Sequence, residues 1–395
     1  SPDFGPVGWR RLGQDIDGEA AGDRSGNPVS LSADGQIVAI GAYLNDANGV
    51  DSGSVRVFQY DATKTTNVTL QSSPDFGPVG WRRLGQDIDG EAAGDDSGFS
   101  VSISADGQIV AIGAITNDGT TTNTTDSRGH VRIYQYDANK TTNVTDQSSP
   151  DYGPIGWRRL GQDIDGEAAG DTSGYSVSLS ADGTIVAIGA YRNDGTTTNV
   201  NDQHGHVRIY QYDANKTTDV TLQTDPNFGP IGWRRLGQDI DGEAAGSQSG
   251  QSVSLSADGS TVAIGAYMND GTSTDTNDNR GHVRIYQYDA TKTTNVTLQT
   301  DPNFGPVGWR RLGQDINGEA ALDQSGRSVS LSADGSTVAI GANYNIGTTG
   351  VNSGHVRVYQ IGEIDTNELP PLDQTTISAV TDSVPTNVTP DATGK

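Results

Sequence analysis

The stretch Trp81-Arg82-Arg83-Leu84-Gly85-Gln86-Asp87-Ile88 decides the fold, because the same eight residues occur five times in the chain. The Trp residues stand at 9, 81, 157, 233 and 309, so the unit repeats every 72 to 76 residues. A fixed internal period is typical of repeat architectures, in which each copy is one supersecondary unit. We therefore divide residues 1–360 into five repeats that start near residues 1, 73, 149, 225 and 301.

Each copy contains four stretches with the pattern of a β-strand, which in the second copy are residues 81–88, 100–104, 109–114 and 130–136. The second and fourth stretches alternate between two kinds of side chain, and the third is a short, β-branched apolar run. Ala105-Asp106-Gly107 predicts a tight hairpin, because Gly takes a positive φ without steric cost. No stretch combines a helical period with caps, so we expect an all-β chain.

The strands differ in side-chain size, and this difference predicts a β-propeller. The Ser-Val-Ser and Val-Ala-Ile-Gly-Ala strands are narrow, whereas the strands with Arg, Tyr and Trp are wide. Radial sheets crowd near the axis, so small residues belong on inner strands, and propellers have roughly four to eight such blades. We expect a five-bladed β-propeller of four-stranded antiparallel blades over residues 1–360, with an open stack of the units as the alternative.

The order Ser-Gly-x-x-Val-Ser-x-Ser-Ala-Asp-Gly, Val-Ala-Ile-Gly-Ala and Gly-His-Val-Arg-(Ile/Val)-Tyr resembles the FG-GAP repeat of integrin-α-type β-propellers. In that family the innermost strand follows the Phe-Gly position. The resemblance therefore implies that each Trp strand is the outermost strand of the preceding blade. Residues 9–16 are then an orphan outer strand, and we expect them to close the ring by completing the last blade, whose third strand ends at Gln360.

Two departures from the family pattern limit what the resemblance implies. The Pro that follows Gly-Ala in the family is absent, and Tyr43, Ile115, Tyr191, Tyr267 and Asn343 stand in its place. The family's calcium loop lies between the first and second blade strands, where this chain has only a Ser-Ala-Asp-Gly hairpin. The family's calcium ligands therefore have no counterpart here.

The composition excludes several classes of function. The chain has 50 acidic and 25 basic side chains and a net charge of −25. Nucleic-acid binding needs a basic surface and anionic membranes repel such a charge, so we expect neither partner. No apolar run approaches the roughly 18 residues of a membrane span. Cys and the common hydrolase and phosphate-binding motifs are absent, so we expect no enzyme.

An acidic turn follows each Trp strand and is the best candidate for a metal site. In the first copy its carboxylates stand at relative positions 1, 3, 5 and 9, which resembles the oxygen spacing of calcium loops. The alternative is a turn whose side chains accept hydrogen bonds from backbone amides. Ser247 and Asn317 each replace one carboxylate in the last two copies. The candidate calcium ligands are Asp15, Asp17, Glu19, Asp23, Asp87, Asp89, Glu91, Asp95, Asp163, Asp165, Glu167 and Asp171.

Arg and His residues also recur with the repeat. Neighbouring strand residues face opposite sides, so we expect one Arg of each Trp-Arg-Arg word to pair with the acidic turn or to stack on Trp or Tyr. His130, His206, His282 and His355 begin the fourth stretch of their copies. No carboxylate is fixed near them in the sequence, so we interpret them as structural hydrogen-bonding residues.

Asn-x-Thr sequons predict N-linked glycans and therefore an extracellular protein, either secreted or at the cell surface. Several recur in the Lys-Thr-Thr-Asn-Val-Thr connection, and Thr-rich runs near residues 120–125 and 196–198 are candidates for O-glycans. The sequons are at Asn67, Asn123, Asn139, Asn143, Asn215, Asn295 and Asn387.

Residues 361–395 form an acidic tail rich in Pro and Thr, which predicts an extended linker. We expect it to connect subunits into a homo-oligomer or filament, with a spacer to a further domain as the alternative. The sequence thus predicts an extracellular structural or adhesive glycoprotein that assembles through its tail. The alternative is a lectin-like or cation-dependent ligand-binding propeller.

Overall fold

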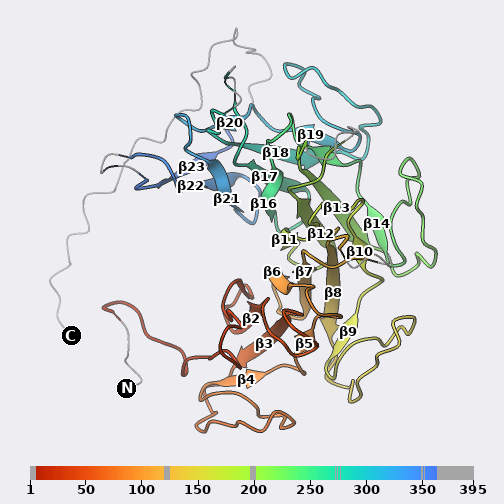
Figure 1. The fold of residues 1–395 in the computed structure, drawn as a ribbon, viewed down its shortest axis with the longest axis vertical. Coiled ribbons are helices and arrows are strands. Elements are labelled where there is room, and N and C mark those ends of the chain that lie inside the picture. Colours follow the sequence, from red (N-terminus) through yellow and green to blue (C-terminus); the bar gives the residue numbers. More distant parts are fainter. Residues whose placement is uncertain are drawn as a thin grey trace, which may run out of the picture.

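The computed structural model describes residues 6–119, 125–195, 202–271, 273, 275, 277–347, 350 and 352–362. All strands of this part belong to five antiparallel sheets, and it contains no helix that could cross a membrane. Figure 1 shows the sheets following one another in chain order around a common axis, from β2 to β5 at the bottom to β21 to β23 at the upper left.

The first four sheets have five strands each and the fifth sheet has three. The first sheet contains β1 (Val29–Leu31), β2 (Ile37–Ala42), β3 (Ser54–Tyr60), β4 (Trp81–Arg83) and β5 (Ile88–Asp89). The second contains β6 (Ser97–Ile103), β7 (Ile109–Ala114), β8 (His130–Tyr136), β9 (Trp157–Arg159) and β10 (Ile164–Asp165). The third contains β11 (Ser176–Leu179), β12 (Ile185–Ala190), β13 (His206–Tyr212), β14 (Trp233–Arg235) and β15 (Ile240–Asp241). The fourth contains β16 (Ser249–Leu255), β17 (Thr261–Ala266), β18 (His282–Tyr288), β19 (Trp309–Arg311) and β20 (Ile316–Asn317). The fifth contains β21 (Ser325–Leu331), β22 (Thr337–Ala342) and β23 (His355–Gln360).

Each of the first four sheets has the predicted strand order. In the second sheet β6 pairs with β7, β7 with β8, and β8 with both β9 and β10. The hairpin between β6 and β7 forms as predicted, with Gly107 at φ 73° and with Asp106 accepting the amide hydrogen of Gln108 at 2.9 Å.

The outer strand differs from the prediction, because residues 81–88 are not one strand but two. Gly85, at φ 65°, separates β4 from the start of β5. The amide of Gln86 donates at 2.8 Å to the carbonyl of Ile155, which precedes β9 of the second sheet. At this point the chain therefore bonds to its neighbour and not to its own sheet. A Cβ on Gly85 would lie 2.6 Å from the indole nitrogen of Trp157. The break between β4 and β5 therefore lets the outer strand of one sheet contact the Trp of the next.

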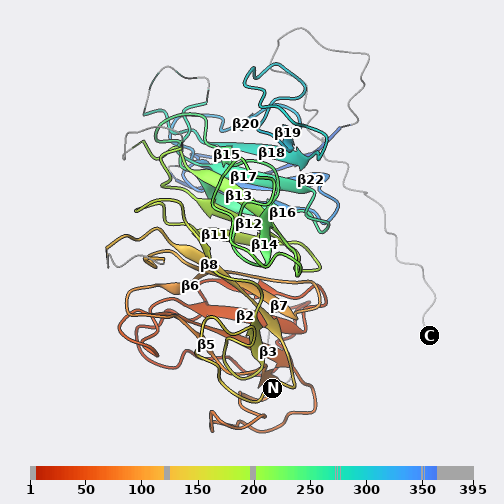
Figure 2. The same ribbon diagram turned by 90° about the vertical axis from the view of Figure 1, so that its right-hand side faces the viewer.

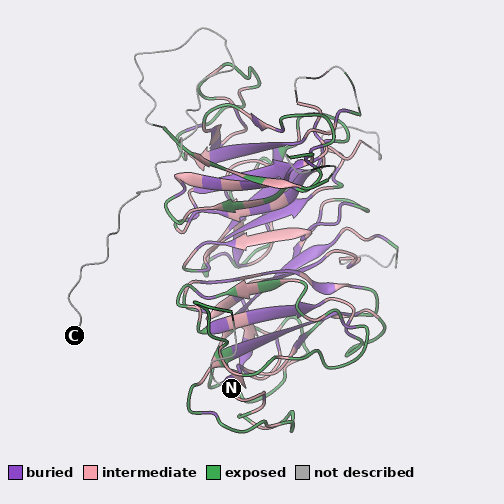
Figure 3. Cartoon of the chain, turned by 90° about the vertical axis from the view of Figure 1, so that its left-hand side faces the viewer, coloured by how far each residue is buried: buried purple, intermediate pink, exposed green. Residues whose placement is uncertain are grey.

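The core lies between the sheets. Because successive strand residues face opposite sides, each sheet presents one apolar face forward, toward the following sheet, and one backward. Val55 and Val57 on the forward face of the first sheet share a buried cluster with Val101, Ile103 and other residues on the backward face of the second. Equivalent clusters join the later sheets. Figure 2 shows the sheets stacked in chain order, and Figure 3 shows buried residues concentrated in the strands.

The predicted closure of the ring does not form in this structure, so that part of the fold prediction is corrected. Residues 9–16 form no strand, and Leu12 and Ile16 pack against the backward face of the first sheet. Among the described residues β23 pairs only with β22. Five sheets joined by near-identical contacts leave the arc open between the fifth sheet and the first (Figure 1). Residues 363–395 of the predicted tail linker, which begins at residue 361, lie outside the described residues.

The position of residues 9–16 nevertheless follows the predicted phase. The indole nitrogen of Trp81 donates to the carbonyl of Leu12 at 3.1 Å, as that of Trp157 donates to Leu84 at 3.0 Å. Residues 9–16 thus lie where the outer strand of a preceding sheet would lie.

Candidate functional site: a charged cluster between neighbouring sheets

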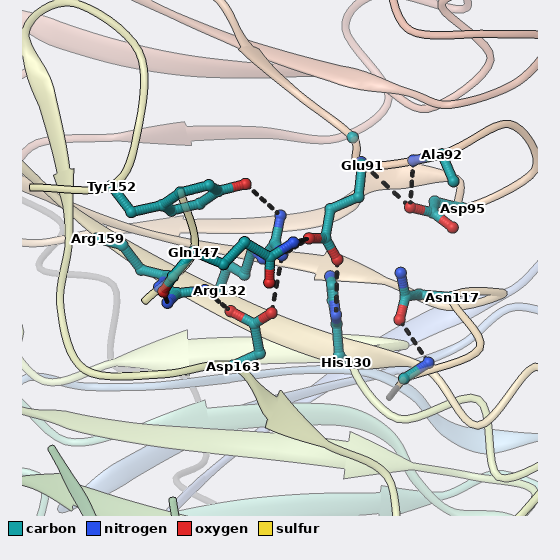
Figure 4. A network of polar contacts seen from close by, with 12 residues as sticks. Glu91, Ala92, Asp95, Asn117, His130, Arg132, Gln147, Tyr152, Arg159 and Asp163 are labelled. Carbon is teal, nitrogen blue, oxygen red and sulfur yellow. Dashed lines mark hydrogen bonds and ion pairs between the residues drawn. The ribbon is translucent and has the colours of Figure 1, made fainter. Parts of the chain in front are cut away.

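A charged cluster recurs where the acidic turn of one sheet meets the third strand of the next. The chain passes from β5 through the turn into β6, which places Glu91 above β8. On β8, His130, Arg132 and Tyr134 share the backward face because they alternate with the forward-facing Val131. Asp163 joins from the connection between β9 and β10 (Figure 4).

Arg132 is the centre of this cluster. Its guanidinium lies 2.8 Å from a carboxylate oxygen of Asp163 and also contacts Glu91. Asp163 receives a second guanidinium, that of Arg159, at 2.6 Å. The Nδ1 atom of His130 lies 4.0 Å from Glu91. Two buried arginines therefore neutralise the two carboxylates beside a buried histidine.

The same arrangement occurs at the next two junctions. Arg208 contacts Glu167 and lies 3.2 Å from Asp239, with the Nδ1 of His206 3.5 Å from Glu167. Arg284 lies 2.7 Å from Glu243 and 2.8 Å from Asp315. The buried Nδ1 atoms of His206 and His282 have no hydrogen-bond partner among the described residues. In each of the three clusters the His nitrogen and the two carboxylates bring ligand atoms within 4.8 Å of one another.

The two ends of the arc have incomplete versions of the cluster. At the last junction Arg357 lies 3.8 Å from Glu319, which is 58% exposed, and the fifth sheet has no outer strand to supply the Asp. At the first sheet Ser54 replaces the His, and Arg56 donates to the backbone carbonyl of Asp17 at 2.8 Å.

The arginine prediction is confirmed. The second Arg of the word is buried and binds the Asp four residues later, as Arg83 binds Asp87 at 2.6 Å. It lies over the predicted Tyr in one copy, where Arg159 is 4.6 Å from the Tyr152 centroid, but over a Phe in three others, as Arg83 is 4.4 Å from the Phe76 centroid. The first Arg is more exposed and binds an Asp that directly follows the third strand of the sheet, as Arg82 binds Asp61 at 2.6 Å.

The structure does not bring the four carboxylates of one acidic turn to one point. In the second copy Asp87 binds Arg83, while Glu91 reaches the next sheet and contacts Arg132. Asp95 accepts the amide hydrogens of Glu91 and Ala92 at 3.2 and 2.9 Å. Asp23, Asp171 and Asp323 each accept an amide hydrogen of their own turn in the same way, and Ser247 replaces this Asp with a hydroxyl that accepts from Asn269 at 3.0 Å. These contacts are those of the backbone-bonded turn.

What the structure gathers instead is the Glu of one turn with the first Asp of the next, as in Glu91 with Asp163. A His nitrogen and two arginine-bound carboxylates do not fit calcium, which prefers roughly six to eight oxygen ligands. Calcium binding by the predicted residues Asp15, Asp17, Glu19, Asp23 and their copies stays a prediction.

The surroundings of Asp163 and Asp165 shift the pKa values of these two carboxyls in opposite directions. Burial opposes ionisation of Asp163, but the charge and hydrogen bond of Arg132 outweigh it and lower its pKa to about 2. Two residues further on, burial and the negative charge of Asp163 raise the pKa of Asp165 to about 7. Burial and the charge of Arg132 lower the pKa of His130 to about 4, so this His is neutral at pH 7.

The pairing of Glu with His was not predicted from the sequence. The two residues are 39 positions apart in three copies, from 91 to 130, 167 to 206 and 243 to 282. That constant separation is the only sequence signal for the contact. The His Nδ1 and a Glu carboxylate oxygen come within about 4 Å of each other only because two sheets dock.

The predicted glycosylation sites are exposed where the structure describes them. Asn67, Asn139, Asn143, Asn215 and Asn295 lie on the surface of the long loops that precede the Trp strands. Asn123 and Asn387 lie outside the described residues.

The fold and the repeated junction define a propeller-type repeat protein. The model of the FG-GAP repeat matches residues 16–58, which confirms the family resemblance, and the matched residues recur in the later copies. No curated protein sequence matches the chain. Among solved structures, a putative 6-phosphogluconolactonase from Bacteroides uniformis is 11% identical, with a TM-score of 0.38 over 85% of this chain and 81% of that one. A TM-score this low carries no argument about function.

Proposed function

We propose that the chain is an extracellular structural or adhesive glycoprotein, and that it acts without catalysis. The observation that carries this proposal is the repetition of the same Arg-centred cluster at three successive junctions. The carboxylates there are bound by arginines of the same junction, which fits a role in fastening the sheets together. FG-GAP repeats are typical of extracellular or surface proteins, and linkage of subunits through residues 361–395 remains part of the proposal.

The exposed sequons support the extracellular part of this proposal. Those that the structure describes lie at exposed positions of the long loops that precede the Trp strands. The test is expression through a eukaryotic secretory pathway, followed by mass spectrometry of each sequon after enzymatic release of glycans in heavy-oxygen water. We expect occupancy at Asn67, Asn143 and Asn295, and a secreted protein with no occupied sequon would contradict the proposal.

A ligand-binding propeller, lectin-like or cation-dependent, is the second candidate. The observation that favours it is the approach of a buried His nitrogen to two carboxylates at three junctions. Arginine already neutralises these carboxylates, which weighs against a bound cation. Calorimetric titration with Ca²⁺ and Zn²⁺ separates the candidates, because saturable binding that is lost in His130→Ala would favour the second one.

A further inference from the structure

The two ends of the arc expose the two halves of an interface that the chain forms internally four times. Val356 and Val358, on the forward face of the fifth sheet, are 68% and 65% exposed. Val29 and Leu31, on the backward face of the first sheet, are 57% and 59% exposed. Exposed apolar groups of this size on a regular sheet mark an interaction surface.

The internal copies of these residues are buried or half-buried, with Val177, Val329 and Leu331 half-buried. The equivalents of Val356 are Val55, Val131, Val207 and Val283, each with 0% exposure. Ile103, Leu179 and Leu255, the equivalents of Leu31, are 7 to 8% exposed. At every internal junction the forward valines contact the backward residues, so the exposed pair at one end fits the exposed pair at the other.

The strand edges at the two ends are complementary as well. Within the described part of the chain β23 has no outer strand, whereas residues 9–17 lie in an outer-strand position without a sheet of their own. In the fourth sheet Tyr286 pairs with Arg311, Gln287 with Arg310 and Tyr288 with Trp309. By the same register residues 359, 360 and 361 would pair with residues 11, 10 and 9. Trp9, now 78% exposed, would then lie where its four copies are buried.

The polar contacts of the junction repeat in the same way. Leu179, Leu255 and Leu331 each donate an amide hydrogen to a Ser of the preceding sheet at 2.9 to 3.0 Å. The amide of Leu31 is the counterpart of these amides at one end, and the hydroxyl of Ser330 is the counterpart of these acceptors at the other. Ser100, Ser176 and Ser252 donate to a Gly carbonyl of the following sheet at 2.6 to 2.8 Å, which leaves Ser328 and Gly26 as the unmatched pair.

We propose that the forward face of the fifth sheet binds the first sheet of a second copy of this chain, whose residues 9–17 complete the fifth sheet as its outer strand. The first and fifth sheets of one chain are separated, and closing the arc would require a change in the close-packed junctions between them. A second copy can dock through the internal contacts unchanged. The contact is heterologous, so it continues into larger assemblies. This proposal deepens the structural role proposed above and gives it an interface separate from the tail.

One substitution blocks this docking without disturbing the fold. A Cβ on Gly113, Gly189 or Gly265 would overlap a backbone carbonyl of the following sheet. On Gly341 it would overlap the side-chain oxygen of Ser328, which has to rotate away, and it would meet no backbone of another sheet. Gly341→Ala therefore keeps the monomer but blocks the fifth sheet. Gly362→Ala is the matched control, because it has open space and because Asp137, Asp213 and Asp289 occupy the equivalent internal position.

The measurement is sedimentation velocity of the full chain over a range of concentrations. We expect the wild-type chain and Gly362→Ala to associate as concentration rises, and Gly341→Ala to associate at least about tenfold more weakly, a loss of about 1.4 kcal/mol. A wild-type chain that stays monomeric throughout, or equal association of all three proteins, would overturn the proposal.

Cross-linking identifies the register and separates a second copy from ring closure. The chain has no Cys, so Arg10→Cys in one protein and Gln360→Cys in another can form a disulfide only between two molecules. Paired residues on antiparallel strands lie within the Cα separation that a disulfide needs. We expect a disulfide-linked heterodimer on oxidation, and none when Asp334→Cys replaces Gln360→Cys.

A double variant with both Cys residues in one chain tests whether the ring closes within a single molecule. An intramolecular disulfide without linked dimers would show that residues 9–17 close their own ring, and absence of any disulfide would show that the edge stays unpaired. Either result overturns the proposal. Unoccupied sequons would reject the extracellular function and leave this interface untouched, so the two failures are distinguishable.

Discussion

At the scale of single residues, the cluster depends on Arg132, whose side chain is only 5% exposed between Glu91 and Asp163. Removing one partner of a buried ion pair leaves uncompensated charge, so Arg132→Met should lower the free energy of unfolding by about 3–5 kcal/mol. Arg158, 37% exposed and 2.6 Å from Asp137, is the matched control, and Arg158→Met should cost about 1 kcal/mol or less. Urea denaturation measures both values, and equal losses would contradict the assigned role of Arg132.

Asp163 and Asp165 should respond to substitution with opposite signs at pH 8. The pKa of Asp163, lowered to about 2, means that its charge stabilises the fold above about pH 4 and that this contribution is lost as pH falls through 2. The pKa of Asp165, raised to about 7, means that the fold is penalised as pH rises from about 4 through 7. Asp163→Asn should therefore destabilise at pH 8, whereas Asp165→Asn should stabilise by about 1–3 kcal/mol there and have no effect below about pH 4.

The measurement is urea unfolding of the wild-type chain and the two Asn variants at a series of pH values. Asp165→Asn that destabilises at pH 8 would contradict the raised pKa, and Asp163→Asn without a loss there would contradict the pairing with Arg132.

At the scale of the element, a β-branched apolar run predicted β7 and a period-two pattern predicted β8, both with their observed ends, because alternation and β-branching are local properties of the strand. The split between β4 and β5 could not be predicted in this way, since the amide of Gln86 bonds to Ile155 in another sheet. The Glu91–His130 contact was missed for the same reason. Local pattern thus determined the strands, whereas the site depends on how two sheets dock.

One buried lysine stabilises each of the long loops that precede the strands β4, β9, β14 and β19. The sequence did not indicate this role either. Lys140 donates from its Nζ to the backbone carbonyls of Thr142, Gly153 and Pro154 at 2.7, 2.5 and 3.0 Å. Lys140→Met would remove this donor and leave the carbonyls of Gly153 and Pro154 with only the amides of Val144 and Trp157, at a cost of about 1–3 kcal/mol. We expect faster hydrogen exchange at Val144 and Gly153, whose amides bond across the loop, and no change for the exposed Asn139→Ala. Unchanged exchange in Lys140→Met would show that the loop holds itself.

At the scale of the whole molecule, the stability of a chain of sheets is approximately a sum of intrinsic terms and nearest-neighbour terms. The third sheet has a neighbour on each side and a complete outer strand, whereas the fifth has one neighbour and three strands. The fifth sheet should therefore open first, and backbone amides of β22 and β23 should exchange at least about tenfold faster than those of β12 and β13, a difference of about 1.4 kcal/mol. Native-state hydrogen exchange at low protein concentration measures this difference.

The same exchange measurement at higher protein concentration shows whether the missing neighbour causes the lower stability of the fifth sheet. If a second copy supplies the missing neighbour and outer strand, exchange from β23 should slow as the chains associate, while exchange from β13 stays constant, because its junctions are already filled within one chain. In Gly341→Ala the slowing should disappear although the low-concentration rates match those of the wild-type chain. Equal exchange from β13 and β23 at every concentration would mean that the fifth sheet has no missing neighbour, and the open arc would then be a complete structure in itself.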